Sequence, residues 1–249
     1  MQLIEKIFLV SLMLGYAVEA ISGPPFITDD PEPVAYQHWE ANIAVTGTRM
    51  SGGSQVFLPQ ADINYGVLPG VQLHVQPQLA YFQHAGGQAF GVGDTELGLK
   101  YRLTPAEAPE EDWMVGVYPL IEVPSGRADR NLGVGTWREY VPLWVQTKRG
   151  PWTVYGGGGY WFNGGALGRN AWAGGAVTLY QVTPTLQLGG EYYFRTADTV
   201  GGHSASSFNL GGTKTLARDY ALLFSVGRGL TQVTTVNEAS FYFGLQVLY

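Results

Sequence analysis

The chain has 249 residues, of which 14% are charged, 13% are aromatic and 35 are Gly. This charged fraction lies well below the roughly 25% of an average soluble domain. Together with the glycine and aromatic content, it fits a barrel that faces lipid better than a cytosolic enzyme. The formal net charge of −6, with no basic stripe, argues against nucleic acid as a partner. The lack of cysteine excludes disulfides, zinc ribbons and thiol catalysis.

Residues 1–20 have the pattern of a secretory signal peptide. Lys6 supplies the positive charge, residues 7–14 form a short apolar core, and Ala20 ends a cleavage-type Val-Glu-Ala sequence, with Ala17 and Ser22 as alternatives. The apolar core is too short to span a membrane as a helix, and no later segment reaches about 18 apolar residues. The sequence therefore predicts an exported protein without a transmembrane helix.

Residues 21–35 contain several Pro and Asp residues and carry no helix or strand signal. They predict an extended leader, which lies on the periplasmic side if the region after it is a membrane barrel. The sequence leaves open whether this leader enters a barrel lumen.

Residues 36–249 contain segments in which apolar and polar residues alternate with a period of two, as they do in half-exposed strands. The predicted strands are 36–48, 55–67, 71–82, 94–103, 113–122, 138–148, 152–162, 171–181, 186–196, 206–215, 220–228 and 239–249. Their number is even, as in single-chain bacterial outer-membrane barrels.

The connections between these segments alternate in length. Tight turns are predicted at 68–70, 149–151, 182–185 and 216–219, and longer loops at 84–93, 123–137, 163–170, 197–205 and 229–238. Short periplasmic turns and longer external loops are typical of outer-membrane barrels. The connection 104–112 is long and acidic where the pattern expects a short turn, and no physical reason for it is apparent.

The last segment carries the clearest strand signal. Phe241, Phe243, Leu245 and Tyr249 share one face, and Gln246 lies on the other. Alternation over about 9–11 residues with the apolar face outward is what a tilted strand needs to cross the hydrocarbon layer. The terminal aromatic residue resembles the C-terminal signature of bacterial outer-membrane barrels. It predicts recognition by the barrel assembly machinery through the strand that ends at Tyr249.

The same outward register sorts the aromatic residues by strand end. The residues expected at the periplasmic ends are Trp39, Tyr65, Tyr101, Trp113, Trp152 and Tyr249, and those expected at the opposite ends are Phe57, Tyr81, Phe194 and Phe241. Two aromatic belts are typical of barrels that contact lipid, because amphipathic rings prefer headgroup level. The sequence thus predicts an all-β, transmembrane, antiparallel up-and-down barrel of about 12 strands, with outer-membrane lipid around it.

The inward register predicts a polar and aromatic lumen. Its candidate lining and selectivity residues are Glu40, Asp62, Glu96, Lys100, Arg102, Tyr118, Glu122, Arg138, Tyr140, Trp144, Glu191, Tyr193 and Arg195. Opposite charges on neighbouring strands would pair and fill the interior under one interpretation. Under the other, aromatic residues line a path for a small, partly apolar solute and the charges set its selectivity.

The longest external loop, 123–137, is a candidate constriction of the pore. It carries Arg127, Asp129 and Arg130, which would narrow the lumen if the loop folded inward. The alternative is a solvated loop that points outward.

Other chemistry has weak support. Gly156–Gly159 lacks the Lys-Ser/Thr and the helix of a phosphate-binding loop, so these glycines predict close packing within a strand. His203 and Ser204 lie in a glycine-rich stretch rather than in a fixed nucleophile–base pair. The four His residues are scattered without ligand spacing. The sequence therefore predicts no catalytic site, no metal and no cofactor.

Several strings in the chain carry a family resemblance. They are Thr28-Asp-Asp-Pro31, His38-Trp-Glu40, Leu58-Pro-Gln-Ala-Asp62, Gly91-Val-Gly-Asp94, Glu122-Val-Pro-Ser-Gly126, Gly150-Pro-Trp152 and Phe208-Asn-Leu-Gly-Gly212. From about Asp29 to Tyr249, the chain resembles the bacterial family of phenol meta-degradation-pathway (MetA-pathway) proteins, often labelled outer-membrane "transporter" proteins. The resemblance implies an outer-membrane barrel associated with uptake of aromatic or hydrophobic compounds. The resemblance identifies no catalytic residue in this chain.

Three functions remain open from the sequence. The first is a channel or facilitator for passive uptake of small hydrophobic or aromatic solutes through the outer membrane. The second is a structural or surface-display barrel whose lumen is closed by paired charges. The third, a membrane lipid hydrolase, would need a Ser/His pair at the lipid-facing rim.

Overall fold

The structure is a computed structural model, and it describes residues 24–105, 109 and 112–249. The predicted signal peptide, residues 1–20, lies outside the described residues, as do the first three residues of the predicted leader. Within the described part of the chain, no helix is long and apolar enough to cross a membrane.

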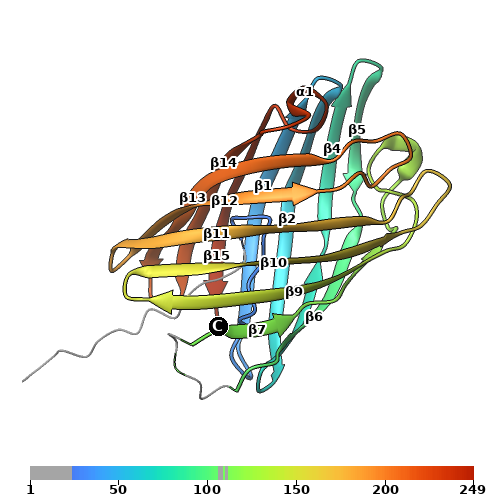
Figure 1. Cartoon of the computed structure of the whole chain (residues 1–249). Coiled ribbons are helices and arrows are strands. Elements are labelled where there is room, and N and C mark those ends of the chain that lie inside the picture. The colour runs from blue at the N-terminus through green and yellow to red at the C-terminus, as the bar shows by residue number, and fades with distance from the viewer. Residues whose placement is uncertain (1–23, 106–108, 110–111) are drawn as a thin grey trace, which may run out of the picture.

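The described residues form one antiparallel sheet that closes on itself into a barrel of 12 crossings (Figure 1). The strands are β1 (Trp39–Met50), β2 (Gly53–Leu68), β3 (Val71–Gln76), β4 (Gln78–His84), β5 (Gly87–Val92), β6 (Thr95–Arg102), β7 (Met114–Val117), β8 (Leu120–Val123), β9 (Arg138–Arg149), β10 (Trp152–Asn163), β11 (Ala171–Thr183), β12 (Leu186–Arg195), β13 (Ala205–Ala217), β14 (Tyr220–Gly229) and β15 (Ala239–Leu248). Each crossing pairs with its sequence neighbours, and β1 pairs with both β2 and β15 to close the barrel. The predicted up-and-down barrel is confirmed.

Three crossings are each interrupted and therefore appear as two strands. Between β3 and β4 stands Pro77, and between β7 and β8 stand Tyr118 and Pro119. Proline has no N–H to give to the ladder, which favours a break at these positions, although β2 and β9 continue through Pro59 and Pro142. The third break, between β5 and β6, falls at Gly93-Asp94.

Strand β5 was not expected, and the prediction of a loop over 84–93 is wrong. Residues 87–92 instead pair with β4, from His84↔Gly87 to Leu79↔Val92, around a tight turn. The segment alternates with Ala89 buried and Phe90 exposed, but two of its six residues are glycine. That composition weakens the strand signal in the sequence.

The connections differ at the two ends of the barrel. The turn end, periplasmic by the usual topology of such barrels, has the tight turns predicted near 69–70, 150–151, 184–185 and 218–219. The opposite, loop end carries the long loops, with the 3-10 helix η1 (Ala128–Arg130) and the short helix α1 (Val233–Val236). The β1–β2 and β4–β5 connections at this end are tight as well.

The outer surface is apolar and the inner surface is polar, as the alternation predicts. On β15, Phe243 is 56% exposed on the outside, whereas Gln246 on the inside is 0% exposed. Aromatic pairs join neighbouring strands at the turn end, with ring centroids 4.4 Å apart for Trp39–Tyr65 and 4.7 Å apart for Trp152–Tyr180. Such pairs suit a strand end at headgroup level.

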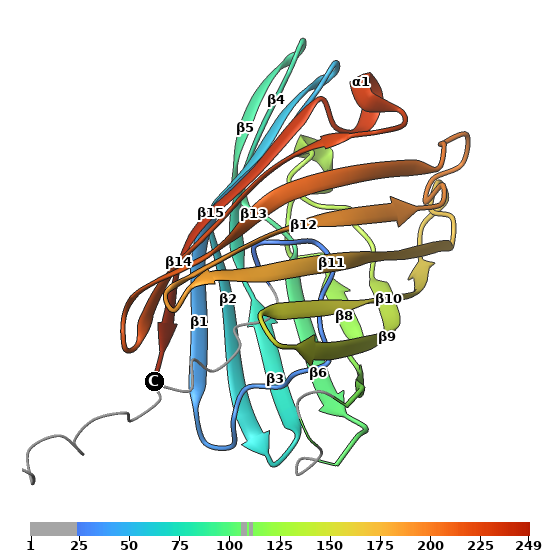
Figure 2. The same ribbon diagram turned by 60° about the vertical axis from the view of Figure 1, so that its left-hand side comes forward.

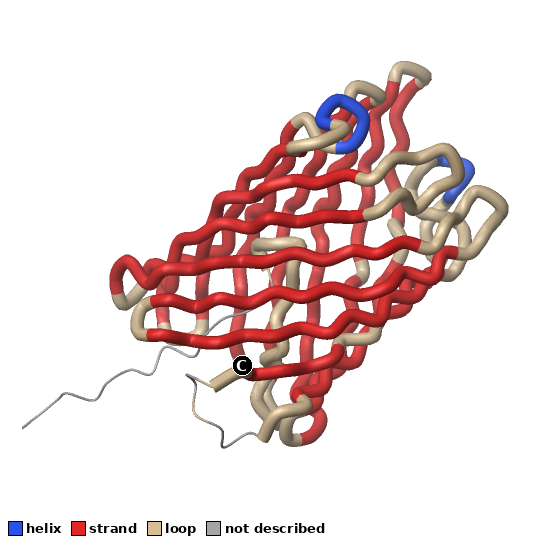
Figure 3. Tube along the Cα trace, in the orientation of Figure 1, coloured by secondary structure: helices blue, strands red, loops and turns tan. Residues whose placement is uncertain are grey.

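The leader lies inside the barrel. Figure 2 shows the blue segment that precedes β1 passing through the interior behind β11, and Figure 3 shows the same segment as a loop enclosed by strands. Thr28 and Asp30 in this segment are 0% exposed. The question that the sequence left open is answered by the fold, because residues 24–35 occupy the lumen and contact its wall.

Candidate functional site

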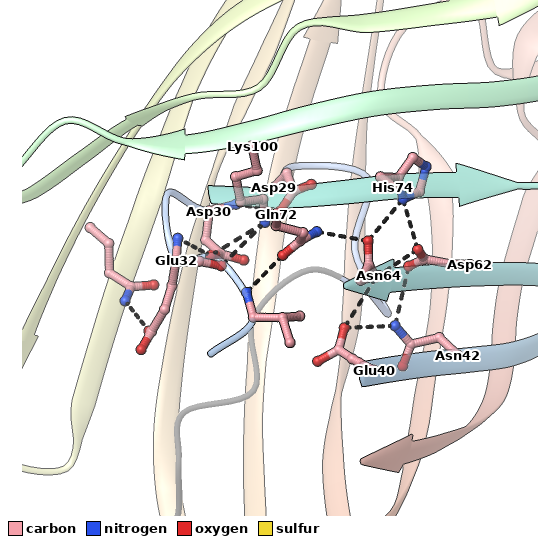
Figure 4. Close-up of polar contacts among 12 residues, drawn as sticks. Asp29, Asp30, Glu32, Glu40, Asn42, Asp62, Asn64, Gln72, His74 and Lys100 are labelled. Atoms are coloured by element: carbon pink, nitrogen blue, oxygen red, sulfur yellow. Dashed lines mark hydrogen bonds and ion pairs between the residues drawn. The ribbon is translucent and has the colours of Figure 1, made fainter. Parts of the chain in front are cut away.

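The carboxylates of the leader meet basic side chains of the wall (Figure 4). Lys100 of β6 places Nζ 2.9 Å from Oδ1 of Asp29 and 3.8 Å from Oδ1 of Asp30. On β9, Lys148 Nζ lies 3.3 Å from Oε2 of Glu32. These ion pairs hold the leader against β6 and β9, which lie on either side of the crossing formed by β7 and β8.

Hydrogen bonds hold the backbone of the leader against other strands. The N–H of Thr28 donates to Oε1 of Glu191 on β12 at 2.5 Å, and Ser225 Oγ on β14 donates to the carbonyl of Pro25 at 2.7 Å. The N–H of Val34 donates to Oε1 of Gln72 on β3 at 2.8 Å. The leader therefore spans the lumen between opposite parts of the wall.

Apolar packing completes the leader's seat. Phe26 packs in a buried cluster with Tyr155, Val177 and Leu179 of β10 and β11. On β7, a Cβ added at Gly116 would lie 3.0 Å from the Cβ of Pro31, so the glycine leaves the room that the leader fills. A bulky side chain at that position would push the leader away from the wall, whereas a Cβ at 3.0 Å requires a shift of only a few tenths of an ångström.

A buried polar network lies beside the leader on β1, β2, β3 and β6 (Figure 4). His74 is its centre, with Nδ1 3.0 Å from Oδ1 of Asp62 and Nε2 3.2 Å from Oε1 of Glu96. Asn42 Nδ2 donates to Glu40 at 3.0 Å and to Asp62 at 3.1 Å. His74 thus lies among three carboxylates, those of Glu40, Asp62 and Glu96, on this side of the lumen. The filling of the interior by opposite charges stays a prediction.

Aromatic residues gather on the inner wall nearer the loop end. Tyr118, Tyr140 and Trp144 form a buried cluster, with Trp161 and Tyr193 packed against it. The rings of Tyr140 and Trp161 stack at 4.7 Å with an interplanar angle of 12°. Tyr118, Tyr140 and Trp144 are 4%, 6% and 2% exposed, so their rings pack against one another and against neighbouring side chains of the wall.

Charges flank this aromatic cluster. The guanidinium of Arg138 lies 4.5 Å from the ring centroid of Trp161, and its Nε is 3.5 Å from Oε2 of Glu122. Lys100 Nζ lies 4.9 Å from the ring centroid of Tyr118, which joins the aromatic cluster to the leader's ion pairs. Cations over aromatic faces are stabilised by the ring quadrupole.

The other predicted lumen residues lie toward the two ends. Arg102, at the turn end of β6, donates to the carbonyl of Pro105 at 2.7 Å. Arg195, at the loop end of β12, pairs with Asp198 at 2.6 Å. Both side chains bond to the adjoining loops, whereas Glu191 and Lys100 bond to the leader.

The candidate constriction loop has its charges in solvent. Arg127 and Asp129 pair at 2.5 Å with side chains about two-thirds exposed, and Arg130 is exposed. The hydrogen bond from Arg127 lowers the pKa of Asp129. The inward-facing part of the loop is Leu132, which is 2% exposed and packs against Ala80 and Ala89. A constriction by the three charged residues stays a prediction.

The inner end of this loop is fixed by Asp94. The N–H of Gly126 donates to its Oδ1 at 2.9 Å, and the N–H of Val134 donates to its Oδ2 at 2.6 Å. A carboxylate that accepts two backbone N–H groups is a strong local anchor. The loop is therefore held by the Leu132 contact and by Asp94, while its charged residues are exposed.

Sequence reasoning did not include several residues of the site. They are Asp29, Asp30, Glu32, Gln72, His74 and Gln146. Gln72 and His74 stood on the polar face of their predicted strand, which was the available signal. The leader acids gave none, because alternation says nothing about a segment that is neither strand nor helix.

The glycine run and the His203–Ser204 pair, which had weak support in the sequence, lie in a strand and in an exposed loop. Gly156–Gly159 lies within β10 and pairs with β9 and β11, where the built Cβ positions would strike backbone atoms. His203 and Ser204 lie exposed in the loop after β12.

The family comparison agrees with the resemblance seen in the sequence. A family model described as "Putative MetA-pathway of phenol degradation" matches residues 27–244. No curated protein matches the sequence significantly.

One solved structure shares the fold of this chain, and two others align less well. An outer membrane channel from Pseudomonas putida F1 aligns with a TM-score of 0.72 at 14% identity, covering 92% of this chain and 100% of that chain. The translocator domain of the autotransporter NalP from Neisseria meningitidis aligns at 0.47 and 12% identity, covering 84% and 87%. The CymD monoaromatic hydrocarbon channel aligns at 0.44 and 9% identity, covering 86% and 87%. Because the last two TM-scores are below 0.5, these two similarities support no conclusion about this chain.

Proposed function

Since this chain belongs to the family of the MetA-pathway of phenol degradation, we propose that it is an outer-membrane channel for passive uptake of small hydrophobic or aromatic solutes. The aromatic cluster of the inner wall carries this proposal. Tyr118, Tyr140 and Trp144 lie on the lumen side of the barrel wall rather than on the lipid side. Contact with the membrane therefore does not explain why these positions are aromatic. The similar channel from Pseudomonas putida supports a channel role.

The proposal includes the location and the partners. The apolar belt is in contact with outer-membrane lipid, and the strand that ends at Tyr249 is recognised by the barrel assembly machinery. Movement of the solute is proposed to be passive. Gly156–Gly159, the segment that might suggest a phosphate-binding loop, lies within strand β10. The protein acts as a channel and not as an enzyme.

Uptake by intact cells tests this function, because lipopolysaccharide slows hydrophobic solutes that pure phospholipid admits. Cells that express the protein should take up the fluorescent aromatic probe N-phenylnaphthylamine faster than cells with an empty vector. Trp144→Ala should lower that uptake relative to hydrolysis of the polar dye nitrocefin by a periplasmic β-lactamase. Trp172→Ala is the matched control, because Trp172 is 61% exposed on the outer face.

Equal uptake by expressing and empty-vector cells would overturn the channel proposal. Equal uptake ratios for the two Trp variants would overturn the role of the aromatic cluster. Heat-modifiable migration in gels should show that each variant is folded before its uptake is compared.

A second function, a barrel that transports nothing, is favoured by one observation. The leader spans the lumen and is paired to it from Lys100 to Glu191. If the leader stays in place permanently, the barrel is sealed and serves only structure or surface display. Absence of both probe and ion movement in wild type, together with movement in a protein without residues 24–35, would establish that alternative.

A further inference from the structure

The leader is an acidic segment seated on a basic part of the wall. Residues 24–35 contain Asp29, Asp30 and Glu32 and no Lys or Arg. Asp29 pairs with Lys100, and Glu32 pairs with Lys148. We propose that Lys100 and Lys148, with Gln146, form a carboxylate-binding site of the solute path, which the leader occupies as a tethered competitor. This inference rests on the proposed channel function and names carboxylates, aromatic ones included, as its solute class.

The two lysines are arranged for carboxylate oxygens. The Lys100 side chain is 4% exposed, so its charge needs a partner at short range. Lys148 Nζ and Gln146 Nε2 converge on the same oxygen, Oε2 of Glu32, at 3.3 Å and 3.0 Å. An ammonium and an amide donor directed at one oxygen are how proteins hold a carboxylate.

An aromatic face lies beside the charge. Tyr118 contacts Lys100 through its ring, at 4.9 Å from Nζ to the centroid, and also belongs to the aromatic cluster with Trp144. A solute with a ring and a carboxylate could place the ring on this cluster while its oxygens meet Lys100. The site therefore fits an aromatic carboxylate better than it fits a bare hydrocarbon.

The leader can leave the lumen without breaking the backbone hydrogen bonds between strands of the barrel. The backbone N–H groups of Thr28 and Val34 donate to side chains of the wall, Glu191 and Gln72, rather than to a strand edge. Gly116 receives Pro31 by contact alone. A segment held by side chains exchanges with a ligand at the cost of those contacts, whereas the strand ladder stays intact.

Charge decides what can replace the leader. When Asp29 and Glu32 leave, Lys100 and Lys148 lose the carboxylates that compensate them inside the barrel. A neutral solute would leave Lys148 without its partner and Lys100 without its nearest one, with only the more distant wall carboxylate Glu40 acting on it, whereas a carboxylate restores the pairs. Carboxylates should therefore compete with the leader, and neutral aromatic compounds of the same shape should not.

Cross-linking of the leader to the wall measures this competition. The chain has no Cys, so Pro31→Cys with Gly116→Cys supplies the only thiols. The built Cβ of residue 116 lies 3.0 Å from Pro31 Cβ, within a small shift of the roughly 3.8 Å of a disulfide. Purified protein in detergent is oxidised with benzoate or with benzamide, which has nearly the same shape and no charge.

Benzoate should slow the cross-link and benzamide should not. A ligand that binds only the vacated site lowers the ratio of seated to vacated leader by 1 + [L]/Kd, which is about tenfold at about nine times Kd. The benzoate concentration is therefore raised until the vacated state predominates, where the cross-linking rate falls with the seated fraction. Lys148→Met in this background should shrink the benzoate-to-benzamide difference. Lys214→Met is the matched control, because Lys214 bonds to Thr185 near the turn end of the barrel.

Equal rates with benzoate and benzamide would overturn the inference, as would an unchanged difference in Lys148→Met. If the pair forms no disulfide, maleimide labelling of Gly116→Cys alone replaces it. Benzoate must then raise the labelling rate more than benzamide does, or the inference fails. The readout is binding by purified protein, so it is separate from the uptake assay, and a failure of either proposal is seen independently.

Discussion

Replacing Asp29 with Asn removes the negative charge that pairs with buried Lys100 and should loosen the leader in the lumen. The pair is short, with 2.9 Å between Nζ and Oδ1, and the Lys100 side chain is 4% exposed. Asn would still accept a hydrogen bond from the Lys100 ammonium, but it would lose the attraction between opposite charges, which is part of the about 1.5–3 kcal/mol that a charged hydrogen bond contributes. The substitution should therefore cost the seated leader about 1–2 kcal/mol, or about five- to thirtyfold in its equilibrium with a displaced leader.

Single-channel recording in planar bilayers is the assay for Asp29→Asn. The fraction of time spent conducting should rise by about that factor over wild type. Asp219→Asn is the matched control, because Asp219 pairs with Arg218 at 3.9 Å on an exposed turn. If Asp29→Asn conducts as rarely as wild type, or if Asp219→Asn conducts as often as Asp29→Asn, the reasoning about the leader is refuted.

Three further predictions concern the leader and the loop 124–137. Gly116→Leu should displace the leader, because a Cβ alone would stand 3.0 Å from it, and should raise conductance; Gly52→Leu, with no atom within 4 Å of its built Cβ, should not. Phe26→Ala should lose about 3–5 kcal/mol of packing from the leader's seat. Hydrogen exchange at residues 27–34 should therefore speed up while the melting temperature of the barrel stays unchanged. Exchange at these residues that is no faster than in wild type would contradict this. Asp94→Ala removes two backbone anchors, so tryptic cleavage of loop 124–137 should accelerate by about tenfold or more, and unchanged cleavage would argue against the anchor.

The barrel could be predicted from the sequence because its strands obey one simple rule. Lipid outside and a polar lumen inside require alternation in every crossing, and β15 shows it with Phe243 outward and Gln246 inward. The same rule failed for β5, where glycines interrupt the pattern. It also could not foresee that Pro77 would divide one crossing into β3 and β4 without ending it.

The candidate site was predictable only in part. Lys100, Glu191 and Tyr140 follow from the inward register of their strands. Their partners do not, because the position of Asp29 beside Lys100 depends on a segment without regular structure that lies 71 residues away in sequence. Contacts of this kind come from three-dimensional closure of the barrel around the leader, which no local pattern encodes.

Removing residues 24–35 and measuring sugar entry into liposomes tests the account most directly, since polar sugars do not cross lipid unaided. Swelling in arabinose should be negligible with the full-length protein and rapid with the folded, heat-modifiable deletion protein. If the folded deletion protein is as impermeable as the full-length protein, wall side chains rather than the leader close the lumen, and the account of a leader-occupied channel is contradicted.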